Sequence, residues 1–166
     1  LTSLVGSEMC IRDRNRIAPG RTFLGIGTGN TAMRAMGQAP MGVKAFGEYI
    51  RVVQGLLKGD EVEYTLNGVT HPIQFQNQEF KYIDVENHIP VHVGGFGPRA
   101  QALAGEIGDG LITGIPRGGT IPQAIKNVQK GAKKSGRSLN SFETFGLVNI
   151  LMLKPKEKLT DESVIT

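Results

Sequence analysis

Val93-Gly-Gly-Phe-Gly-Pro-Arg99 joins a short apolar run to an amphipathic one through a cluster of glycines. The apolar run before it, Ile89-Pro-Val-His-Val93, predicts a strand, and Pro98 suits the first turn of a helix. A strand that passes through glycines directly into a helix is the βα unit from which parallel sheets are built. This junction therefore predicts an α/β fold.

The same unit repeats upstream. Residues 22–26 predict a strand that ends in the loop Gly27-Thr28-Gly29-Asn30. The helix that follows has one apolar stripe at intervals of three and four residues, and Gly59 is expected to end it. The stripe consists of Phe46, Tyr49, Ile50, Val53, Leu56 and Leu57.

Downstream, the helix that starts at Pro98 is expected to stop at Gly108-Asp109-Gly110. Residues 111–113 then predict a third strand, and residues 114–119 a loop. Thr120 is expected to cap a helix that runs to about Ser135. A last strand is expected over residues 142–153, and Thr160 is a candidate start for another helix.

Residues 62–88 interrupt this alternation. Asn67-Gly68 between two β-prone runs is typical of a hairpin with a type I′ turn. Because the segment joins a helix to a strand, we expect it at the end of a barrel opposite the catalytic face.

About four βα units account for residues 15–166, whereas a closed (β/α)₈ barrel takes roughly 250 residues. We therefore expect a partial TIM-like barrel, truncated at both ends. Residues 1–14 show no helical or strand period, and they resemble translated sequencing-adapter read-through. A genuine flexible leader is the alternative.

Composition limits the classes of function. The net charge is +4, and Lys126, Lys130, Lys133, Lys134 and Arg137 form a basic end of one helix. No aromatic residues alternate with these cations, so we expect no nucleic-acid partner. No run approaches the length of a membrane-spanning helix, and no Cys/His cluster has metal-ligand spacing. Cys10 is the single cysteine, so a reducing cytoplasm is the expected compartment.

Gly94, Gly95 and Gly97 are candidates for a phosphate site. Glycines allow close approach of an anion, and a helix N-terminus offers unpaired amides and partial positive charge. Arg99 can add a charge-assisted bond. The alternative is a glycine turn that serves only strand-to-helix packing.

A second glycine-rich loop, Gly25-Ile-Gly-Thr-Gly29, lacks the spacing of a dinucleotide fingerprint because Asn30 stands where that motif needs glycine. We interpret it as a barrel loop in which Thr28 and Asn30 contact a ring or substrate, with a plain turn as the alternative. Arg117 follows the third strand and is a candidate for an anionic cofactor tail, with simple solvent exposure as its alternative.

The other ionisable candidates are interpreted as structural. Glu106 and Asp109 precede a strand and so belong to the stability face of a barrel. His71, His88 and His92 lack triad or metal-ligand partners in the sequence, and we expect them at the surface or in strand packing.

Several segments in order resemble the luciferase-like monooxygenase superfamily, in the branch of coenzyme F420-dependent methylenetetrahydromethanopterin reductase. The similarity spans about residues 17–153. It rests on residues 20–30, Glu48-Tyr49, residues 56–59, Ile89-Pro-Val91, Gly97-Pro-Arg99 and residues 103–112.

The resemblance implies a TIM-like barrel that binds FMN or F420 at the carboxyl ends of its strands, usually as a homodimer. It places the phosphate near Gly94, Gly95, Phe96 and Gly97, with Thr28 and Asn30 toward the ring. The implied function is hydride transfer to, or oxygen activation on, a small organic substrate. The early strands of the family would precede this chain, so no general acid or base is named. The alternatives are a sugar-phosphate enzyme on the same barrel and a non-catalytic cofactor-binding relative.

Overall fold

The centre of the structure is a four-stranded parallel sheet. A computed structural model describes residues 2–66, 68–76, 78–81, 84–114, 120–148, 152–153, 155–156 and 158. The sheet has the order β1 (Leu24–Ile26), β4 (Val91–Gly94), β5 (Gly110–Gly114) and β6 (Glu143–Leu147). Each strand pairs with the next sheet strand along the chain. This sequential order is that of a barrel segment, whereas a dinucleotide-binding sheet reverses its order at a switch point.

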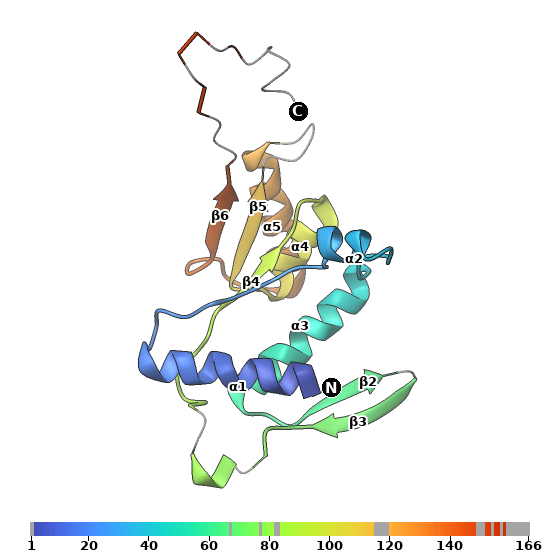
Figure 1. Cartoon of the computed structure of the whole chain (residues 1–166), viewed down its shortest axis with the longest axis vertical. Helices are drawn as coiled ribbons and strands as arrows, with labels where there is room; N and C mark the ends of the chain where they lie inside the picture. The colour runs from blue at the N-terminus through green and yellow to red at the C-terminus, as the bar shows by residue number, and fades with distance from the viewer. Residues whose placement is uncertain are drawn as a thin grey trace.

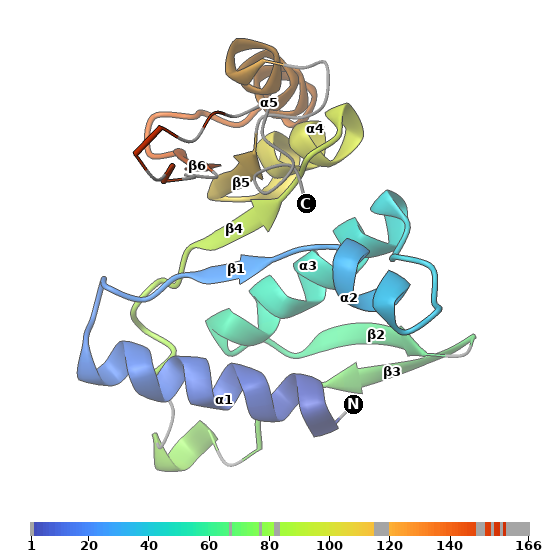
Figure 2. The ribbon, with the colours of Figure 1, turned by 45° about the horizontal axis from the view of Figure 1, so that its top comes forward.

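Helices cover one side of this sheet. Buried residues of α3 (Val43–Lys58), α4 (Pro98–Ile107) and α5 (Ile121–Ser135) join the same strand residues in one core, and Figure 2 shows α4 between α3 and α5. The core lies between the two layers, where strand residues Val91, Val93 and Leu111 meet the apolar stripes of the helices. The predicted stripe of α3 is confirmed: Phe46, Ile50, Val53, Leu56 and Leu57 are buried, and Tyr49 packs partly buried against them.

No described helix covers the other side of the sheet, which we call its open side. Phe23, Phe145 and Leu147 lie on it and keep 51%, 40% and 56% of their surface exposed. In a closed barrel these inward-facing positions would form the packed interior. The described strands therefore form part of a barrel wall, with one face packed under helices and one face that no described helix covers.

The hairpin predicted within residues 62–88 is present. Strands β2 (Val62–Leu66) and β3 (Val69–Ile73) pair antiparallel, and a short 3₁₀ turn, η1 (Gln78–Phe80), follows. Asn67 of the expected turn lies outside the described residues. The hairpin lies at the end of the molecule opposite the arrowheads of β4, β5 and β6, as expected (Figure 1).

Three elements differ from the sequence expectation. The leader forms a helix, α1 (Thr2–Ile17), although its residues show no apolar period. Contacts with distant residues hold this helix: Arg12 and Asn15 donate to the carbonyl oxygen of Asn87 at 2.6 and 3.3 Å, and Ile11 packs against the core. A six-residue helix, α2 (Asn30–Ala35), has no buried residue and so gives no apolar signal.

The last strand is shorter than expected. β6 ends at Leu147, whereas residues 142–153 were expected to be extended. Its ladder partner β5 has Gly114 as its last described residue, opposite Leu147, so the described part of β5 offers no further parallel hydrogen bonds. The candidate helix start at Thr160 lies outside the described residues.

Candidate functional site

Two glycine-rich loops meet at the carboxyl edge of the sheet, and the end of β5 adjoins them. Ile26 pairs with Val93, so the loops that follow β1 and β4 start side by side. A Cβ on Gly94 would lie 3.3 Å from the carbonyl oxygen of Ile26 and 3.4 Å from Cα of Gly27. On the other side, the ring of Phe96 lies over Gly114. The structure thus brings together the segments that sequence analysis selected separately.

The first turn of α4 presents free main-chain donors at this edge. The amides of Phe96, Gly97, Arg99 and Ala100 have no acceptor in the described part of the chain. Gly97 is the N-cap residue with extended backbone, and nothing lies within 4 Å of the place where its Cβ would be. Such amides, with the positive end of the helix dipole behind them, suit an anionic group.

Gly95 has a different role from the one expected. Its amide donates to the carbonyl oxygen of Ile112 at 2.9 Å, so this donor extends the sheet and is not available to an anion. A Cβ at Gly95 would lie 3.1 Å from Ala100 and from the amide nitrogen of Gln101. Gly95 therefore lets the loop pack against the first turn of α4, which was the packing alternative for these glycines.

The loop after β1 adds two polar side chains. Thr28 is partly buried, its carbonyl oxygen accepts from the amide of Met41 at 3.1 Å, and its hydroxyl has no partner among the described residues. The Oδ1 atom of Asn30 accepts from Nε of Arg34 at 2.9 Å. The free hydroxyl of Thr28 can thus contact a ligand, whereas the oxygen of Asn30 is already engaged within α2.

The side chain of Arg99 lies on the outer helix layer and not beside the free amides. Arg99 is exposed and lines a groove of about 750 Å³ on the outer helix layer, together with residues of α3 and α5 such as Arg51 and Lys130. The groove lies over α4 and not on the open side of the sheet. Arg117 lies outside the described residues.

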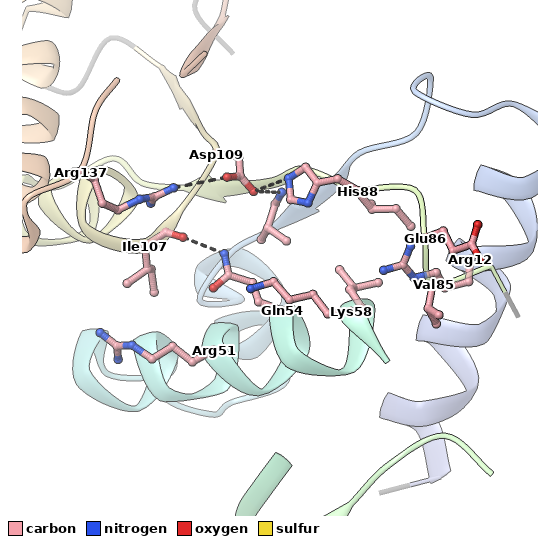
Figure 3. Close-up of a pocket in the computed structure, with 13 residues that line it drawn as sticks. Arg12, Arg51, Gln54, Lys58, Val85, Glu86, His88, Ile107, Asp109 and Arg137 are labelled. Atoms are coloured by element: carbon pink, nitrogen blue, oxygen red, sulfur yellow. Dashed lines mark hydrogen bonds and ion pairs between the residues drawn. The ribbon is translucent and has the colours of Figure 1, made fainter. Parts of the chain in front are cut away.

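The opposite end of the strands is held by structural ion pairs. Asp109 accepts from the amide of Val91 at 3.0 Å and lies 3.4 Å from both His88 Nε2 and Arg137 Nη2. These contacts border a cavity of about 420 Å³ (Figure 3). Glu106 bridges Arg51 and Lys134 at 3.2 and 3.0 Å. The structural interpretation of both carboxylates is confirmed.

His92 occupies the open side of the sheet near the amino end of β4. It is fully buried because the ring of Phe23 stacks on it and the ring of Phe145 lies tilted against it, with centroids 4.6 and 5.0 Å away. Burial lowers the pKa of His92, and the nearby carboxylates of Glu143 and Asp109 oppose this shift. The expectation of a strand-packing histidine is confirmed.

The loop residues at the carboxyl edge can bind and orient a ligand. Residues 27–30 and 94–97 supply amides, a hydroxyl and an aromatic ring, but no carboxylate, imidazole or amine. Proton transfer therefore needs a group from elsewhere. Within the described residues no group of three or more His, Cys, Asp or Glu side chains could hold a metal ion, and no helix there has the length and apolar character to cross a bilayer.

Comparison with known sequences gives a consistent family. The family model of luciferase-like monooxygenases matches residues 15–163. The chain is 28% identical to 5,10-methylenetetrahydromethanopterin reductase of Archaeoglobus fulgidus, over 87% of this chain and 42% of the reductase. It is 31% identical to the F420-dependent glucose-6-phosphate dehydrogenase of Beutenbergia cavernae, over 76% of this chain and 38% of that enzyme. The chain thus spans about two-fifths of the length of these curated relatives.

Solved structures agree with the fold. An F420-dependent secondary alcohol dehydrogenase in complex with an F420–acetone adduct superposes with a TM-score of 0.68 at 21% identity, over 87% of this chain and 44% of that one. Riboflavin lyase with modified FMN superposes with a TM-score of 0.60 at 13% identity, over 86% of this chain and 37% of that one. These likenesses confirm the partial barrel fold.

Proposed function

Because the chain belongs to the luciferase-like monooxygenase family, we propose that it takes part in the oxidation or reduction of a small organic substrate by coenzyme F420 or FMN. Bound at the carboxyl edge of the sheet, such a cofactor would accept or deliver a hydride or, as the flavin, activate oxygen. The residues described here bind and orient it, and they keep water from part of its surface.

The free amides at the first turn of α4 are the observation that carries this proposal. They lie at the same edge as the loop with Thr28, and Phe96 beside them is 55% exposed and available for contact with a ligand. We propose that the amides of Phe96, Gly97, Arg99 and Ala100 hold the cofactor phosphate. Thr28 and Phe96 then contact the remainder of the cofactor. Asn30 can contribute its side-chain amide donors, and Gly94 and Gly95 contribute by allowing the close packing of the loop.

The relatives favour F420 and leave the substrate open. The names of two curated relatives and one solved structure concern a pterin, a sugar phosphate and an alcohol. FMN stays a candidate because riboflavin lyase was solved with a modified FMN. A cofactor-free sugar-phosphate isomerase or aldolase receives no support from these relatives. A cytoplasmic homodimer is the further expectation that the family carries, and light scattering measures the oligomeric state.

Gly97→Asp tests the phosphate site directly. The position has room for a side chain, and aspartate is a favourable N-cap residue, so we expect α4 to be kept or slightly stabilised. The new carboxylate occupies the free amides and repels an anion. We expect titrations followed by F420 or FMN fluorescence to show binding to the wild type and at least about ten-fold weaker binding to the variant.

Two matched variants serve as controls. Gly97→Asn adds a neutral cap of the same shape and is expected to weaken binding less than Gly97→Asp. Gly42→Asp makes the same charge change at the N-cap of α3, where there is also room for a side chain, and should leave affinity unchanged. If the wild type binds neither cofactor, the proposed function is wrong; equal affinities for Gly97→Asp and the wild type would exclude this phosphate site.

A further inference from the structure

A buried polar pair joins α4 to α5 near the candidate site. Nδ2 of Asn127 donates to Oε1 of Gln101 at 2.8 Å, and the two residues are only 6% and 3% exposed. Nε2 of Gln123 in turn donates to Oδ1 of Asn127 at 3.4 Å. None of these three residues stands out in the sequence, because single amide side chains on helices carry no periodic signal.

The pair belongs to a continuous series of hydrogen bonds between two loops. At one end, the amide of Gln123 donates to Oγ1 of Thr120, which caps α5 directly after the loop that follows β5. At the other end, the amide of Gln101 donates to the carbonyl oxygen of Gly97, in the loop that follows β4. The series thus connects the start of α5 to the N-cap of α4 across the helix interface.

Helix packing alone leaves the position of the first turn of α4 incompletely determined. Further along the interface the helices are in backbone contact, because a Cβ on Gly105 would collide with the carbonyl oxygen of Val128 and one on Gly131 with that of Ala102. Such contacts set how closely the helices approach but are not directional. A hydrogen bond is directional, so the Asn127–Gln101 bond can fix the rotation of α4 at the end where its free amides lie.

The energetic balance agrees with a positioning role. Burying two amide side chains costs desolvation free energy, and a satisfied pair contributes little net stability compared with two apolar side chains of similar shape. A buried polar pair does, however, select one arrangement of the elements that it joins. This pair lies one turn after the N-cap of α4, close to the free amides. Selecting one orientation of α4 there fixes the direction of those amides.

We propose that Gln101 and Asn127 are positioning residues that hold the first turn of α4 so that its free amides face an anionic cofactor group. The inference rests on the cofactor site proposed above. Neither side chain needs to touch the cofactor. Both act through the main chain of residues 97–101.

The test replaces both residues in the purified protein, as Gln101→Leu with Asn127→Leu. Removing both partners leaves no unpaired buried amide, so we expect a melting temperature close to that of the wild type. We expect faster hydrogen exchange in residues 95–101, and about ten-fold weaker binding of F420 or FMN. Should the double variant not fold, Asn127→Ser takes its place; it withdraws the Nδ2 donor from Gln101 and the Oδ1 acceptor from the exposed side chain of Gln123.

Two further variants separate positioning from general loosening. The exchanged pair, Gln101→Asn with Asn127→Gln, can restore the hydrogen bond and should recover both exchange rates and affinity. Gln54→Leu removes the 2.7 Å bond from Nε2 of Gln54 to the carbonyl oxygen of Ile107, at the other end of α4 (Figure 3). Gln54→Leu should change neither the hydrogen-exchange rates of residues 95–101 nor the affinity for the cofactor.

Hydrogen exchange and cofactor binding test different parts of the proposal. Unchanged exchange in residues 95–101 of the double variant would overturn the positioning role, whatever the affinity. Faster exchange with unchanged affinity would also overturn it, because the amides would then not need to be held. A wild type that binds neither cofactor contradicts the proposed function, and the positioning role toward a cofactor is then wrong as well, even if exchange shows that the pair orders the turn.

Discussion

The imidazole of His92 packs against the aromatic rings of Phe23 and Phe145, and carboxylates lie nearby. Neither ring nitrogen has a hydrogen-bond partner in the described structure, although Nε2 lies 3.3 Å from Oε2 of Glu143. Burial is the largest influence on its pKa and lowers it from the ordinary value of 6.5; Glu143 and Asp109 act in the opposite direction. The fold therefore favours the neutral imidazole.

This preference predicts a pH dependence of stability. Between the lowered pKa of the folded state and 6.5, the unfolded chain binds a proton more readily than the folded chain. The free energy of unfolding should thus be constant with respect to His92 above about pH 6.5 and decrease as the pH falls below it. His92→Phe, which keeps an aromatic ring in the stack, should flatten this decrease when urea unfolding is compared at about pH 5 and about pH 7.5. His71→Gln in the exposed hairpin is the control. If the free energy of unfolding fell equally with pH in His92→Phe and the wild type, His92 would not be the source of the decrease.

Asp109 is the second residue whose effect can be measured. One carboxylate accepts from the amide of Val91 and pairs with Arg137 and His88, so it fixes the start of β4 and β5 together. We expect Asp109→Ala to lower the free energy of unfolding by about 1–3 kcal/mol, chiefly because the amide of Val91 loses its acceptor. Glu63→Ala, an exposed carboxylate of the hairpin, should change it by less than about 0.5 kcal/mol. Chemical denaturation measures the free energy of unfolding of both variants. Similar losses would show that the contacts of Asp109 stabilise the protein no more than an exposed carboxylate does.

At the scale of elements, the interface of α4 and α5 depends on residues without side chains. Gly105 and Gly131 face the backbone of the opposite helix, so that carbonyl groups take the space of a Cβ. The sequence shows both glycines inside helices, where glycine is unfavourable by about 1 kcal/mol relative to alanine. The closer packing of α4 and α5 that these glycines allow offsets this local cost in helix stability.

Gly105→Ala should therefore destabilise the protein despite the higher helix propensity of alanine. The added methyl group would collide with the main chain of Val128, which cannot rotate away. We therefore expect the free energy of unfolding to fall by at least about 1–3 kcal/mol. Lys126→Ala, at an exposed position of α5, is the matched control and should be nearly neutral. Thermal and urea unfolding measure both, and an increase in stability for Gly105→Ala would show that the two helices are not in backbone contact.

At the scale of the whole molecule, the open side of the sheet is the dominant feature. Phe23, Phe145 and Leu147 expose much of their surface on one face, next to the β6 edge, which pairs with no strand in the described part of the chain. Exposed apolar faces and unpaired edges promote association.

We expect this 166-residue chain to self-associate through the open side. Leu147→Lys places a charge on that face and at the β6 edge, and should lower the apparent mass measured by light scattering. Ile125→Lys changes a residue of α5 that is 42% exposed on the opposite side, and should have no effect. Equal reductions by the two substitutions would show that association does not depend on the open face.

Element type could be predicted along most of the chain because the signals are local. The stripe of α3, the Pro98 start of α4 and the Thr120 cap of α5 depend on neighbours within a few residues, and so does the hairpin around Gly68. Helix α1 has no comparable signal, because its described contacts are with distant parts of the chain: its side-chain hydrogen bonds go to Asn87, and Ile11 packs against the core.

The glycine-rich loops and their place at helix starts are likewise a property of the sequence alone, and so is the family to which the chain belongs. Which donors of those loops remain free was decided by tertiary structure. The amide of Gly95 was taken by Ile112 of the next strand, and the first turn of α4 was tied to α5 through Gln101 and Asn127. The physical reason is that a hydrogen-bonding group has many possible partners in an extended chain, and only the packing of distant strands and helices determines which one lies within reach.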